Sequence, residues 1–376
     1  MRQRMENEGG ARRVVVTKDL PGRRWIEVLT GADCAVMVCE SRAVLTVDDI
    51  KAAIGDRCDG VIGQLTEPWG TELFDALRVA GGKVYSNYAV GFDNVRVHEA
   101  TERGIAVGNT PGVLTETTAE MAVALTFAAA RRVGEAERFL RDGSFDGWLP
   151  DLFLGKRLWG GTLGIVGAGR IGTEFARMLA PGHSMDVLYS DVVDRPELEA
   201  FLAGYSDLVE KSGRRRLVCR RVDGIEELLE RSDVVSLHTP LTDETRHLMN
   251  GERLARMKPD ALLVNTARGP IIDEAALVEH LRANPGFRAG LDVFEDEPAL
   301  AAGLADMPNV VIVPHIASAT DWTREGMATL AACNVAAVLQ GHPATRELVA
   351  EHFLAGDVPD RAPSILNASE LGLALA

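Results

Sequence analysis

The stretch LGIVGAGRIGTEFARML, residues 163–179, places three glycines between an apolar run and a segment with helical periodicity. Their GxGxxG spacing is weak evidence by itself, but the strand–turn–helix pattern around it is the context that the motif requires. The first glycine permits a tight turn, the second lets a pyrophosphate approach the backbone, and the third lets the helix pack against the strand. The helix amino end then offers unpaired N–H donors to phosphate. The stretch predicts a Rossmann-type dinucleotide-binding domain, and the contacts expected from it are Gly167, Gly169, Arg170, Ile171 and Gly172.

The next apolar run, MDVLYSD (residues 185–191), indicates which nicotinamide cofactor binds. It ends at Asp191, 19 residues beyond Gly172. A carboxylate at this place accepts hydrogen bonds from the adenosine ribose and repels the 2′-phosphate of NADP(H). We therefore expect NAD(H), with NADP(H) less favoured, although the nearby Arg195 would weaken this preference.

Length and composition are typical of a globular chain with two domains. The chain has 376 residues, of which 46% are hydrophobic and 25% charged. Its net charge of −15 argues against a nucleic-acid-binding surface, because phosphate binding needs a basic face. The one dense basic stretch, GRRRLVCRR (residues 213–221), is interpreted as a solvated loop. The five cysteines form no CxxC pair and are interpreted as reduced packing residues; since no HExxH motif occurs either, no metal site is expected.

The apolar runs and the two terminal sequences predict the compartment of the protein. No apolar run reaches the ~18 residues that a membrane span needs. The amino-terminal MRQRMENEGGARR lacks the apolar core of a signal peptide, and the chain ends in Ala374-Leu375-Ala376 where a peroxisomal signal would have Ser-Lys-Leu. We expect a cytoplasmic protein that binds neither membrane nor nucleic acid, with an organelle as the alternative.

Short apolar runs alternate with helical segments in both halves of the chain, which predicts parallel sheets. The expected fold class is α/β, with two Rossmann-like doubly wound parallel-sheet domains, a flavodoxin-like substrate domain and an NAD-binding domain. One long helix over residues 115–143 is expected to lead into the second domain, and a last helix over residues 321–340 to precede a tail that returns to the first. The expected domains are residues 1–115 with 318–376 for substrate binding, and residues 116–317 for NAD binding. The predicted strands are RVVVT, CAVMVCE, GVIGQL, KVYSNYAV and IAVGNT in the first domain, and GTLGIVGAG, DVLYSD, DVVSLHTP, ALLVNTARG, RAGLDVF and NVVIVPH in the second.

Four chemically active side chains follow apolar runs of the second domain. Arg268 follows ALLVN, Asp292 follows RAGL, His315 follows NVVIVP, and Glu297 lies in the loop FEDEP. Ligands of a doubly wound sheet bind beyond the carboxyl ends of its strands, so all four are expected to face the same crevice as the glycine loop. Their joint position there predicts a catalytic site.

The chemistry expected of these residues is reduction of a carbonyl group. Histidine titrates near neutral pH, so a protonated His315 suits donation to a carbonyl oxygen while a nicotinamide supplies hydride. A hydrogen bond between the imidazole and Glu297 would favour the imidazolium and raise its pKa. Arg268 presents a rigid fork of five donors, which suits the carboxylate of a substrate and holds its carbonyl in line. His238, after DVVSL, is interpreted as lining the cofactor side.

Several stretches resemble signatures of a known family. GIVGAGRIG, NTARGPIIDEAALVEHL, AGLDVFEDEP and VPHIASAT are similar, in this order, to the cofactor, arginine, glutamate and histidine signatures of the D-isomer-specific 2-hydroxyacid dehydrogenases. CDGVIGQLTE, SNYAVGFDNV, GNTPGVLTETTAE and GWLPDLFLGK, with an insert over residues 195–223, resemble the plant-type NADH-dependent hydroxypyruvate reductases of that family. The resemblance covers about residues 13–368, and it implies that Arg268, Glu297 and His315 are the catalytic residues.

The resemblance also implies contacts and an assembly. The family is usually dimeric, so a homodimer is expected, with the helix after Thr115 near its interface. The implied substrate contacts, besides Arg268, are backbone groups near Gly63, Gln64, Val90 and Gly91. The implied contacts around the nicotinamide and its ribose are Thr239, Thr266 and Asp292, and we include His238 and Pro240 with them.

We therefore expect NADH-dependent reduction of hydroxypyruvate to D-glycerate, with glyoxylate reduction to glycolate as a side activity. The residues alone indicate a small 2-keto acid and NADH; hydroxypyruvate comes from the resemblance. Phosphoglycerate and D-lactate dehydrogenases of the same family are alternatives, and so is a nonenzymatic NAD-sensing module like the corepressors of this fold. A formate dehydrogenase is disfavoured because Glu297 is present. A short-chain-type dehydrogenase is disfavoured because neither Tyr189 nor Tyr205 has a lysine four residues on.

Overall fold

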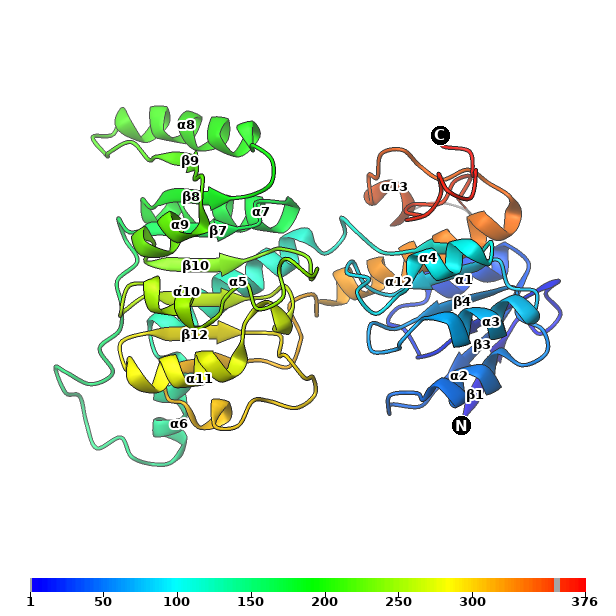
Figure 1. Cartoon of the computed structure of the whole chain (residues 1–376), viewed down its shortest axis with the longest axis horizontal. Helices are drawn as coiled ribbons and strands as arrows, with labels where there is room; N and C mark the ends of the chain where they lie inside the picture. Colours follow the sequence, from blue (N-terminus) through cyan, green and yellow to red (C-terminus); the bar gives the residue numbers. More distant parts are fainter. Residues whose placement is uncertain (1, 355–358) are drawn as a thin grey trace. The chain divides into compact units, whose positions relative to one another are not determined.

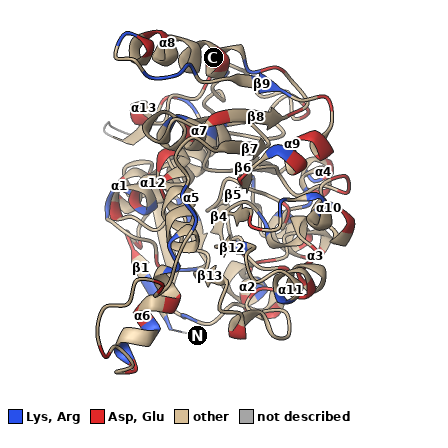
Figure 2. Ribbon diagram, turned by 90° about the vertical axis from the view of Figure 1, so that its left-hand side faces the viewer, with Lys and Arg blue, Asp and Glu red and all other residues tan. Residues whose placement is uncertain are grey.

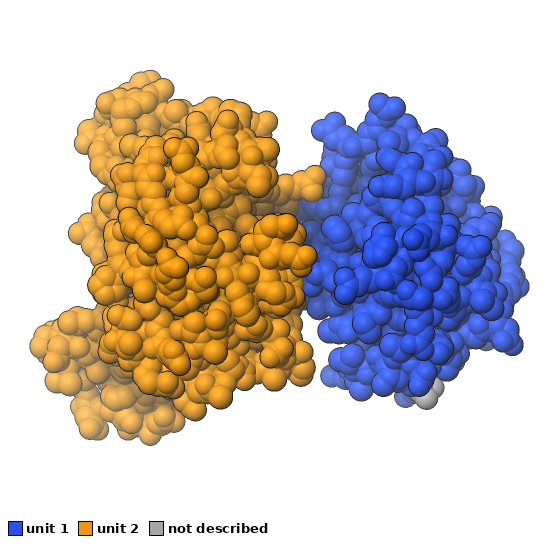
Figure 3. Space-filling model, in the orientation of Figure 1, with its two compact units in different colours: residues 1–114, 319–376 blue, residues 115–318 orange. Residues whose placement is uncertain are grey.

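The structure is a computed structural model that describes residues 2–354 and 359–376. The chain divides into two compact units (Figure 3). Unit 1 comprises residues 1–114 and 319–376, and unit 2 comprises residues 115–318. Each unit is built on one sheet that is covered by helices on both faces. Within the described ranges, no helix combines the length and the apolarity needed to cross a bilayer.

The sheet of unit 1 has six strands in the order β1-β3-β2-β4-β5-β6. Strands β2 to β6 are the five predicted runs, and they are parallel. Their continuous Val and Ile content follows from burial on both faces. The order of these five strands is the flavodoxin-like one. The strands are β1 (Gln3–Glu6), β2 (Arg12–Val16), β3 (Cys34–Cys39), β4 (Gly60–Gly63), β5 (Val84–Asn87) and β6 (Ala106–Gly108).

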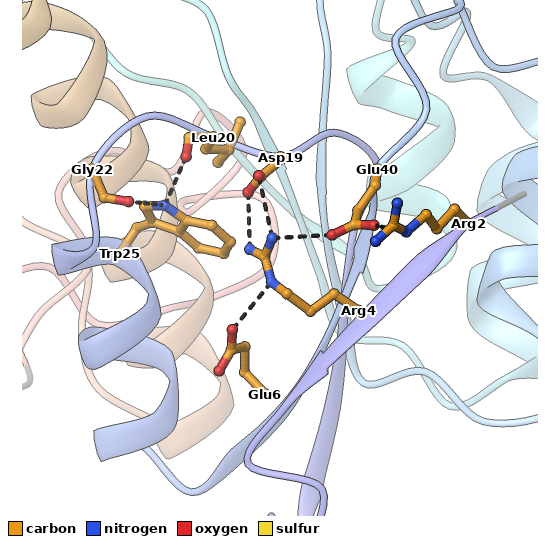
Figure 4. Close-up of polar contacts among 8 residues, drawn as sticks. All are labelled: Arg2, Arg4, Glu6, Asp19, Leu20, Gly22, Trp25 and Glu40. Carbon is orange, nitrogen blue, oxygen red and sulfur yellow. Dashed lines mark hydrogen bonds and ion pairs between the residues drawn. The ribbon is translucent and has the colours of Figure 1, made fainter.

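Strand β1 was not predicted, and it pairs antiparallel with β3 at the edge of the sheet. Three of its four residues are polar, so it lacks the apolar pattern of a strand. Ion pairs hold it in place (Figure 4): Arg4 Nη2 lies 2.9 Å from Asp19 Oδ1, and Arg2 Nε lies 2.8 Å from Glu40 Oε2. A polar sequence is tolerated in an edge strand that has a solvated face. Because β1 has no apolar pattern to fix its register, its ion pairs with residues outside the strand hold it in register.

The helices of unit 1 cover the two faces of its sheet (Figure 1). Helices α2, α3 and α4 form one apolar core with the sheet through side chains such as Ile50, Phe74 and Ala100. Helix α12 packs against β4 and β5 on the other face, beside α1, and spans the predicted residues. The helices are α1 (Arg24–Gly31), α2 (Val47–Ile54), α3 (Thr71–Val79), α4 (Val97–Glu102), α12 (Asp321–Gln340) and α13 (Glu351–Leu354).

The sheet of unit 2 has seven parallel strands in the order β13-β12-β11-β10-β7-β8-β9. The chain builds outward from β7 on one side, then returns and builds outward from β10 on the other. In such sheets ligands bind outside the carboxyl ends of the two strands at this reversal, here β7 and β10. The strands are β7 (Thr162–Val166), β8 (Asp186–Ser190), β9 (Cys219–Arg221), β10 (Val234–Leu237), β11 (Leu262–Asn265), β12 (Arg288–Leu291) and β13 (Val310–Ile312).

Two apolar cores lie on the two faces of this sheet (Figure 1). One includes side chains of α5, α7 and α8, and the other includes side chains of α9, α10 and α11. The helices are α5 (Thr115–Ala130), α6 (Val133–Arg141), α7 (Arg170–Leu179), α8 (Pro196–Glu210), α9 (Ile225–Arg231), α10 (Gly251–Arg256) and α11 (Glu274–Ala283), with short 3-10 helices η1 (Pro181–His183), η2 (Gly269–Ile271) and η3 (Leu304–Asp306).

The prediction of one helix over residues 115–143 is wrong, because the chain breaks between α5 and α6 at Arg132, which has φ +57°. The carbonyl of Ala130 accepts the N–H of Lys156 at 2.8 Å in place of an intrahelical donor. The backbone at Gly155, just before Lys156, packs directly against this carbonyl group, since a side chain at Gly155 would lie 2.4 Å from the Ala130 oxygen. A contact from a distant residue therefore ends α5.

The basic stretch over residues 213–221 is only partly the solvated loop that was expected. Its last three residues form the edge strand β9. Four of its five arginines are paired with acids; for example, Arg216 lies 2.5 Å from Asp207 of α8, and Arg215 lies 2.8 Å from Asp186. Blue and red positions accordingly alternate around α8 and β9 in Figure 2. These ion pairs neutralise much of the stretch.

Candidate active site

The glycine loop joins β7 to α7 at the carboxyl end of the unit 2 sheet. Gly167 has φ +86°, and a side chain there would lie 2.9 Å from backbone atoms of His238 and Thr239. A side chain on Gly172 would lie 2.3 Å from the carbonyl oxygen of Gly167. The space next to Gly169 is open. The loop is therefore packed tightly at its first and third glycines and open at the second, as pyrophosphate binding requires.

Arg170 and Ile171 are the first two residues of α7, directly after its N-cap. The first amides of a helix have no intrahelical acceptor, so they can donate to phosphate oxygens. The Thr173 hydroxyl donates to the carbonyl of Ala168 at 2.9 Å and fixes the turn from inside. The exposed guanidinium of Arg170 adds positive charge to this helix end.

Asp191 follows β8, as expected, but its carboxylate has a partner. Arg195 Nη2 lies 3.1 Å from one carboxylate oxygen and 3.2 Å from the other. The Asp191 side chain is only 6% exposed. The amide of Arg195 donates to the Tyr189 hydroxyl at 2.9 Å, which fixes the backbone of the loop. The acidic residue and its neighbouring arginine thus form one ion pair at the end of β8.

His238, Thr239 and Pro240 follow β10, across from the glycine loop. The His238 ring lies beside Phe175, with its Nε2 2.9 Å from the Ser236 hydroxyl. Burial lowers the pKa of His238 to about 3, so this histidine is neutral and does not supply protons at neutral pH. The Thr239 hydroxyl is buried and has no hydrogen-bond partner within the described residues, whereas Pro240 is exposed.

Arg268 lies in the loop between β11 and η2. The buried Asn265 organises this loop: its Nδ2 donates to the carbonyl of Arg268 at 2.8 Å, and its Oδ1 accepts the N–H of Ala267 at 3.0 Å. Sequence reasoning missed Asn265, although a polar residue at the end of an apolar strand is a signal for it. The Thr266 hydroxyl is buried, and no partner for it occurs in the part of the chain that the structure describes.

Asp292 is fully buried after β12, where it holds the loop that carries His315. Its two carboxylate oxygens accept the N–H groups of Ile316 at 2.6 Å and Ala317 at 2.9 Å. Burial raises the pKa of Asp292, although these two hydrogen bonds oppose the shift. Because both carboxylate oxygens accept backbone hydrogen bonds, Asp292 has a structural role that was not predicted.

Glu297 and His315 form a hydrogen-bonded pair. Glu297 Oε2 lies 2.9 Å from His315 Nδ1, and Glu297 Oε1 accepts the N–H of Phe294 at 3.0 Å. Burial would raise the pKa of Glu297, but the hydrogen bond and charge of His315, the Phe294 amide and the charge of Arg268 together lower it. The carboxylate is therefore an anion at neutral pH. The pairing leaves Nε2 of the imidazole for another partner.

The four predicted substrate contacts belong to unit 1 and cluster at the ends of β4 and β5. The Tyr88 amide donates to the carbonyl of Gly63 at 2.9 Å. The carbonyls of the other three accept side-chain amides: Gln64 from Asn94 at 3.1 Å, Val90 from Asn109 at 2.8 Å, and Gly91 from Asn87 at 2.9 Å. A set of buried or half-buried asparagines, which sequence reasoning did not identify, thus supports both loops.

This fold is that of a nicotinamide-dependent dehydrogenase class. Residues 123–317 match the model of the NAD binding domain of the D-isomer specific 2-hydroxyacid dehydrogenases. The chain belongs to this family, and residues 123–317 contain the nicotinamide-cofactor domain of the family.

Individual relatives give the similarity more detail. The chain is 55% identical over 370 residues to a Cucumis sativus protein named glycerate dehydrogenase, covering 97% of each chain. It is 46% identical over 286 residues to a glyoxylate reductase of Korarchaeum cryptofilum, covering 76% of this chain and 80% of the relative. Among solved structures, the TT0316 protein of Thermus thermophilus is similar with a TM-score of 0.78 at 38% identity, covering 94% of this chain and 99% of that one.

Proposed function

We propose that the protein reduces small 2-keto acids with NADH, with hydroxypyruvate to D-glycerate as its main reaction and glyoxylate to glycolate as a second. The observation that carries the proposal is the hydrogen-bonded Glu297–His315 pair. The charge of Arg268 is close enough to this pair to lower the pKa of Glu297. The relatives named glycerate dehydrogenase and glyoxylate reductase support the choice of substrates.

In this reaction His315 is the proton donor and Arg268 the substrate clamp. Since Nδ1 of His315 is engaged by Glu297, Nε2 is the atom that donates to the substrate oxygen. The Glu297 anion stabilises the imidazolium and fixes the orientation of the ring. The guanidinium of Arg268 binds the substrate carboxylate through paired hydrogen bonds and orients the carbonyl carbon. When bound, the reduced nicotinamide supplies the hydride.

The residues of unit 2 fit a nicotinamide cofactor. The opening at Gly169 leaves room for a pyrophosphate, and the buried hydroxyls of Thr239 and Thr266, which lack partners within the described residues, can bind polar groups of the cofactor. We propose that NADH is preferred, because the Asp191 carboxylate disfavours a 2′-phosphate. Its ion pair with Arg195 supports the preference, because the pairing occupies an arginine that could otherwise bind the 2′-phosphate. The other proposed cofactor contacts are Gly167, Arg170, Ile171, Gly172, His238, Pro240 and Asp292.

We propose different roles for the two units. Unit 2 binds the cofactor and carries the three catalytic residues, and unit 1 is the substrate-binding domain. Gly63, Gln64, Val90 and Gly91 contribute the substrate contacts of unit 1. Their support by asparagine side chains favours this role, because a rigid backbone loop binds a small anion better than a mobile one.

A homodimer is part of the proposal. Helix α6 and the segment after it expose a series of apolar side chains, which is unusual for a monomeric surface. They are Val133, Leu140, Phe145, Trp148, Leu149, Leu154 and Trp159. We define these residues as the apolar arm and propose that it pairs with a second copy of the chain. The five free cysteines, four of them buried, favour a reducing compartment such as the cytoplasm for this dimer.

The test of the proposed function is oxidation of NADH by the purified chain with hydroxypyruvate, glyoxylate and pyruvate in parallel assays, and NADPH as the second cofactor. We expect the highest kcat/KM for hydroxypyruvate with NADH. Highest activity on pyruvate would move the assignment to a D-lactate dehydrogenase. Measurable NADH binding without turnover of any keto acid would refute the proposal and favour a cofactor sensor.

A further inference from the structure

We propose that Glu274, together with the His247–Glu295 pair, positions Glu297 for its contact with His315. We call these three residues the loop brace. The inference rests on the proposed function, because it assigns the brace to the reaction in which Glu297 takes part. All three residues lie in unit 2 and touch the loop over residues 294–301 or its neighbours.

Glu274 holds the loop from both sides of Glu297. It is the first residue of α11 and is only 3% exposed. One carboxylate oxygen accepts the N–H of Glu295 at 2.7 Å, and the other accepts the N–H of Ala301 at 3.1 Å. The two amides flank Glu297 in the chain, so one buried carboxylate sets the path of the backbone that carries it. Burial raises the pKa of Glu274, and retaining such a costly group suggests a specific role.

The His247–Glu295 pair forms the second part of the loop brace. His247 Nε2 is hydrogen-bonded to Glu295 Oε1, and Glu295 Oε2 accepts the N–H of Glu274 at 3.3 Å. The amide of His247 donates to the carbonyl of Pro270 at 2.8 Å. The pair therefore ties the 294–301 loop to the segment that follows Arg268.

The two loops also meet directly. A side chain at Gly269 would lie 1.8 Å from the carbonyl oxygen of Phe294, so only glycine allows this approach. The amide of Phe294 donates to Glu297 Oε1 at 3.0 Å. A displacement of the backbone at Phe294 would therefore move the Glu297 carboxylate and press on the residue next to Arg268.

This arrangement matters because catalysis depends on small displacements. A shift of about 1 Å in a positioned group can lower a rate by about a hundredfold. The side chains of Glu274 and His247 bind the 294–301 loop, whereas Glu297 binds the His315 ring, so the first two are positioning residues that act through Glu297. Their loss should resemble a weaker form of the loss of Glu297.

The test compares Glu274→Gln with Glu279→Gln, an exposed glutamate of the same helix, each in the wild-type and in the Glu297→Gln background. A glutamine at position 274 has one acceptor oxygen for two amide donors, so one contact is lost. We expect Glu274→Gln to lower kcat for hydroxypyruvate about tenfold and to shift the pH profile in the same direction as Glu297→Gln, with the Kd of NADH unchanged. It should have little further effect once Glu297 is already replaced.

The outcomes separate the inference from the function on which it rests. An equal loss of kcat from Glu274→Gln in both backgrounds, or no loss in either, would overturn the inference while Glu297→Gln still impairs the enzyme. A wild-type chain without reductase activity would refute the proposed function itself. If Glu274→Gln does not fold, His247→Met and His247→Gln replace it. The glutamine keeps a donor for Glu295 and should retain most of the activity, whereas equal activity of the two variants would overturn the inference.

Discussion

The carboxylate of Asp191 is held by the guanidinium of Arg195, with Nη2 3.1 Å and 3.2 Å from the two oxygens. This ion pair is the feature of the site that sets cofactor choice in our proposal. The acid opposes a 2′-phosphate, and at the same time it occupies the arginine that would bind one. The preference for NADH therefore depends on a single side chain.

Replacing that side chain should change the cofactor preference. Asp191→Ala removes the repelling charge and frees Arg195, so we expect the ratio of kcat/KM with NADPH to kcat/KM with NADH to rise by at least about tenfold. Steady-state kinetics with both cofactors measures it. Asp191→Ala with Arg195→Ala is the control, because it lacks the phosphate ligand and should gain less activity with NADPH. An unchanged ratio in both variants would remove Asp191 from cofactor selection.

Replacing Arg268 should abolish turnover and spare cofactor binding. Arg268→Ala removes the proposed clamp on the substrate carboxylate, and we expect kcat/KM for hydroxypyruvate to fall by about a thousandfold. The Kd of NADH, measured by its fluorescence, should change little. Arg231→Ala is the matched control and should behave as the wild type, because this exposed arginine ends α9 just before the amino end of β10, whereas the proposed site lies at the carboxyl ends of the strands. Retained kcat/KM in Arg268→Ala would disprove the clamp.

Replacing Glu297 should move the pH dependence of the reaction. Glu297→Gln keeps the shape of the side chain but removes the anion that stabilises the imidazolium of His315. We expect kcat to fall at least about tenfold and the basic limb of the kcat/KM profile for reduction to move to lower pH. The measurement is a set of rates between about pH 5 and pH 9. A profile that keeps its position would exclude Glu297 from proton transfer.

A second pH effect concerns stability. Asp233, at the amino end of β10, accepts the N–H of Thr162 at 2.8 Å and lies 3.0 Å from Lys258 Nζ and 3.3 Å from Lys156 Nζ. Burial would raise the pKa of Asp233, but the amide and the two lysines lower it below the usual value of an aspartate. Since the folded state favours the Asp233 anion, this anion contributes to the free energy of unfolding at pH values above the pKa that Asp233 has in the unfolded chain. This contribution is lost as the pH falls through the lower pKa that Asp233 has in the folded protein.

We therefore expect Asp233→Asn to lower the free energy of unfolding by about 1–2 kcal/mol at neutral pH. The difference from the wild type should shrink below about pH 4. Urea denaturation at a series of pH values measures it, with the exposed Asp243→Asn as control. A difference that stays constant down to the lowest pH would show that the charge of Asp233 is not the cause.

The proposed homodimer predicts the effect of substitutions in the apolar arm. Trp148 is 81% exposed, and tryptophan is enriched among the residues that contribute most of the binding energy of interfaces. Trp148→Ser should weaken dimerisation by about tenfold or more, whereas Leu208→Ser, which changes an exposed apolar residue of α8, should not. Sedimentation equilibrium measures both. A wild-type chain that is monomeric at high concentration would contradict the proposed homodimer.

The sequence by itself determined the local elements of this protein. The predicted apolar runs became strands β2 to β8 and β10 to β13, because each run carries its own period and its own bounding residues. The glycine loop is equally local, since the roles of its three glycines depend on a turn between one strand and one helix. Arg268, Glu297 and His315 stand out as candidates because the rule that ligands lie beyond strand ends needs only the strand positions.

Tertiary structure alone decided the remaining features, because each depends on a partner far away in the chain. The end of α5 is set by Lys156, and the polar strand β1 is held by β3 and by ion pairs. Glu274 appears in the sequence as an ordinary first-turn acid of a helix, and only folding brings its oxygens to the amides of Glu295 and Ala301. A hydrogen bond depends on distance in space, and the apolar periodicity of a segment contains no information about which distant amide will reach it.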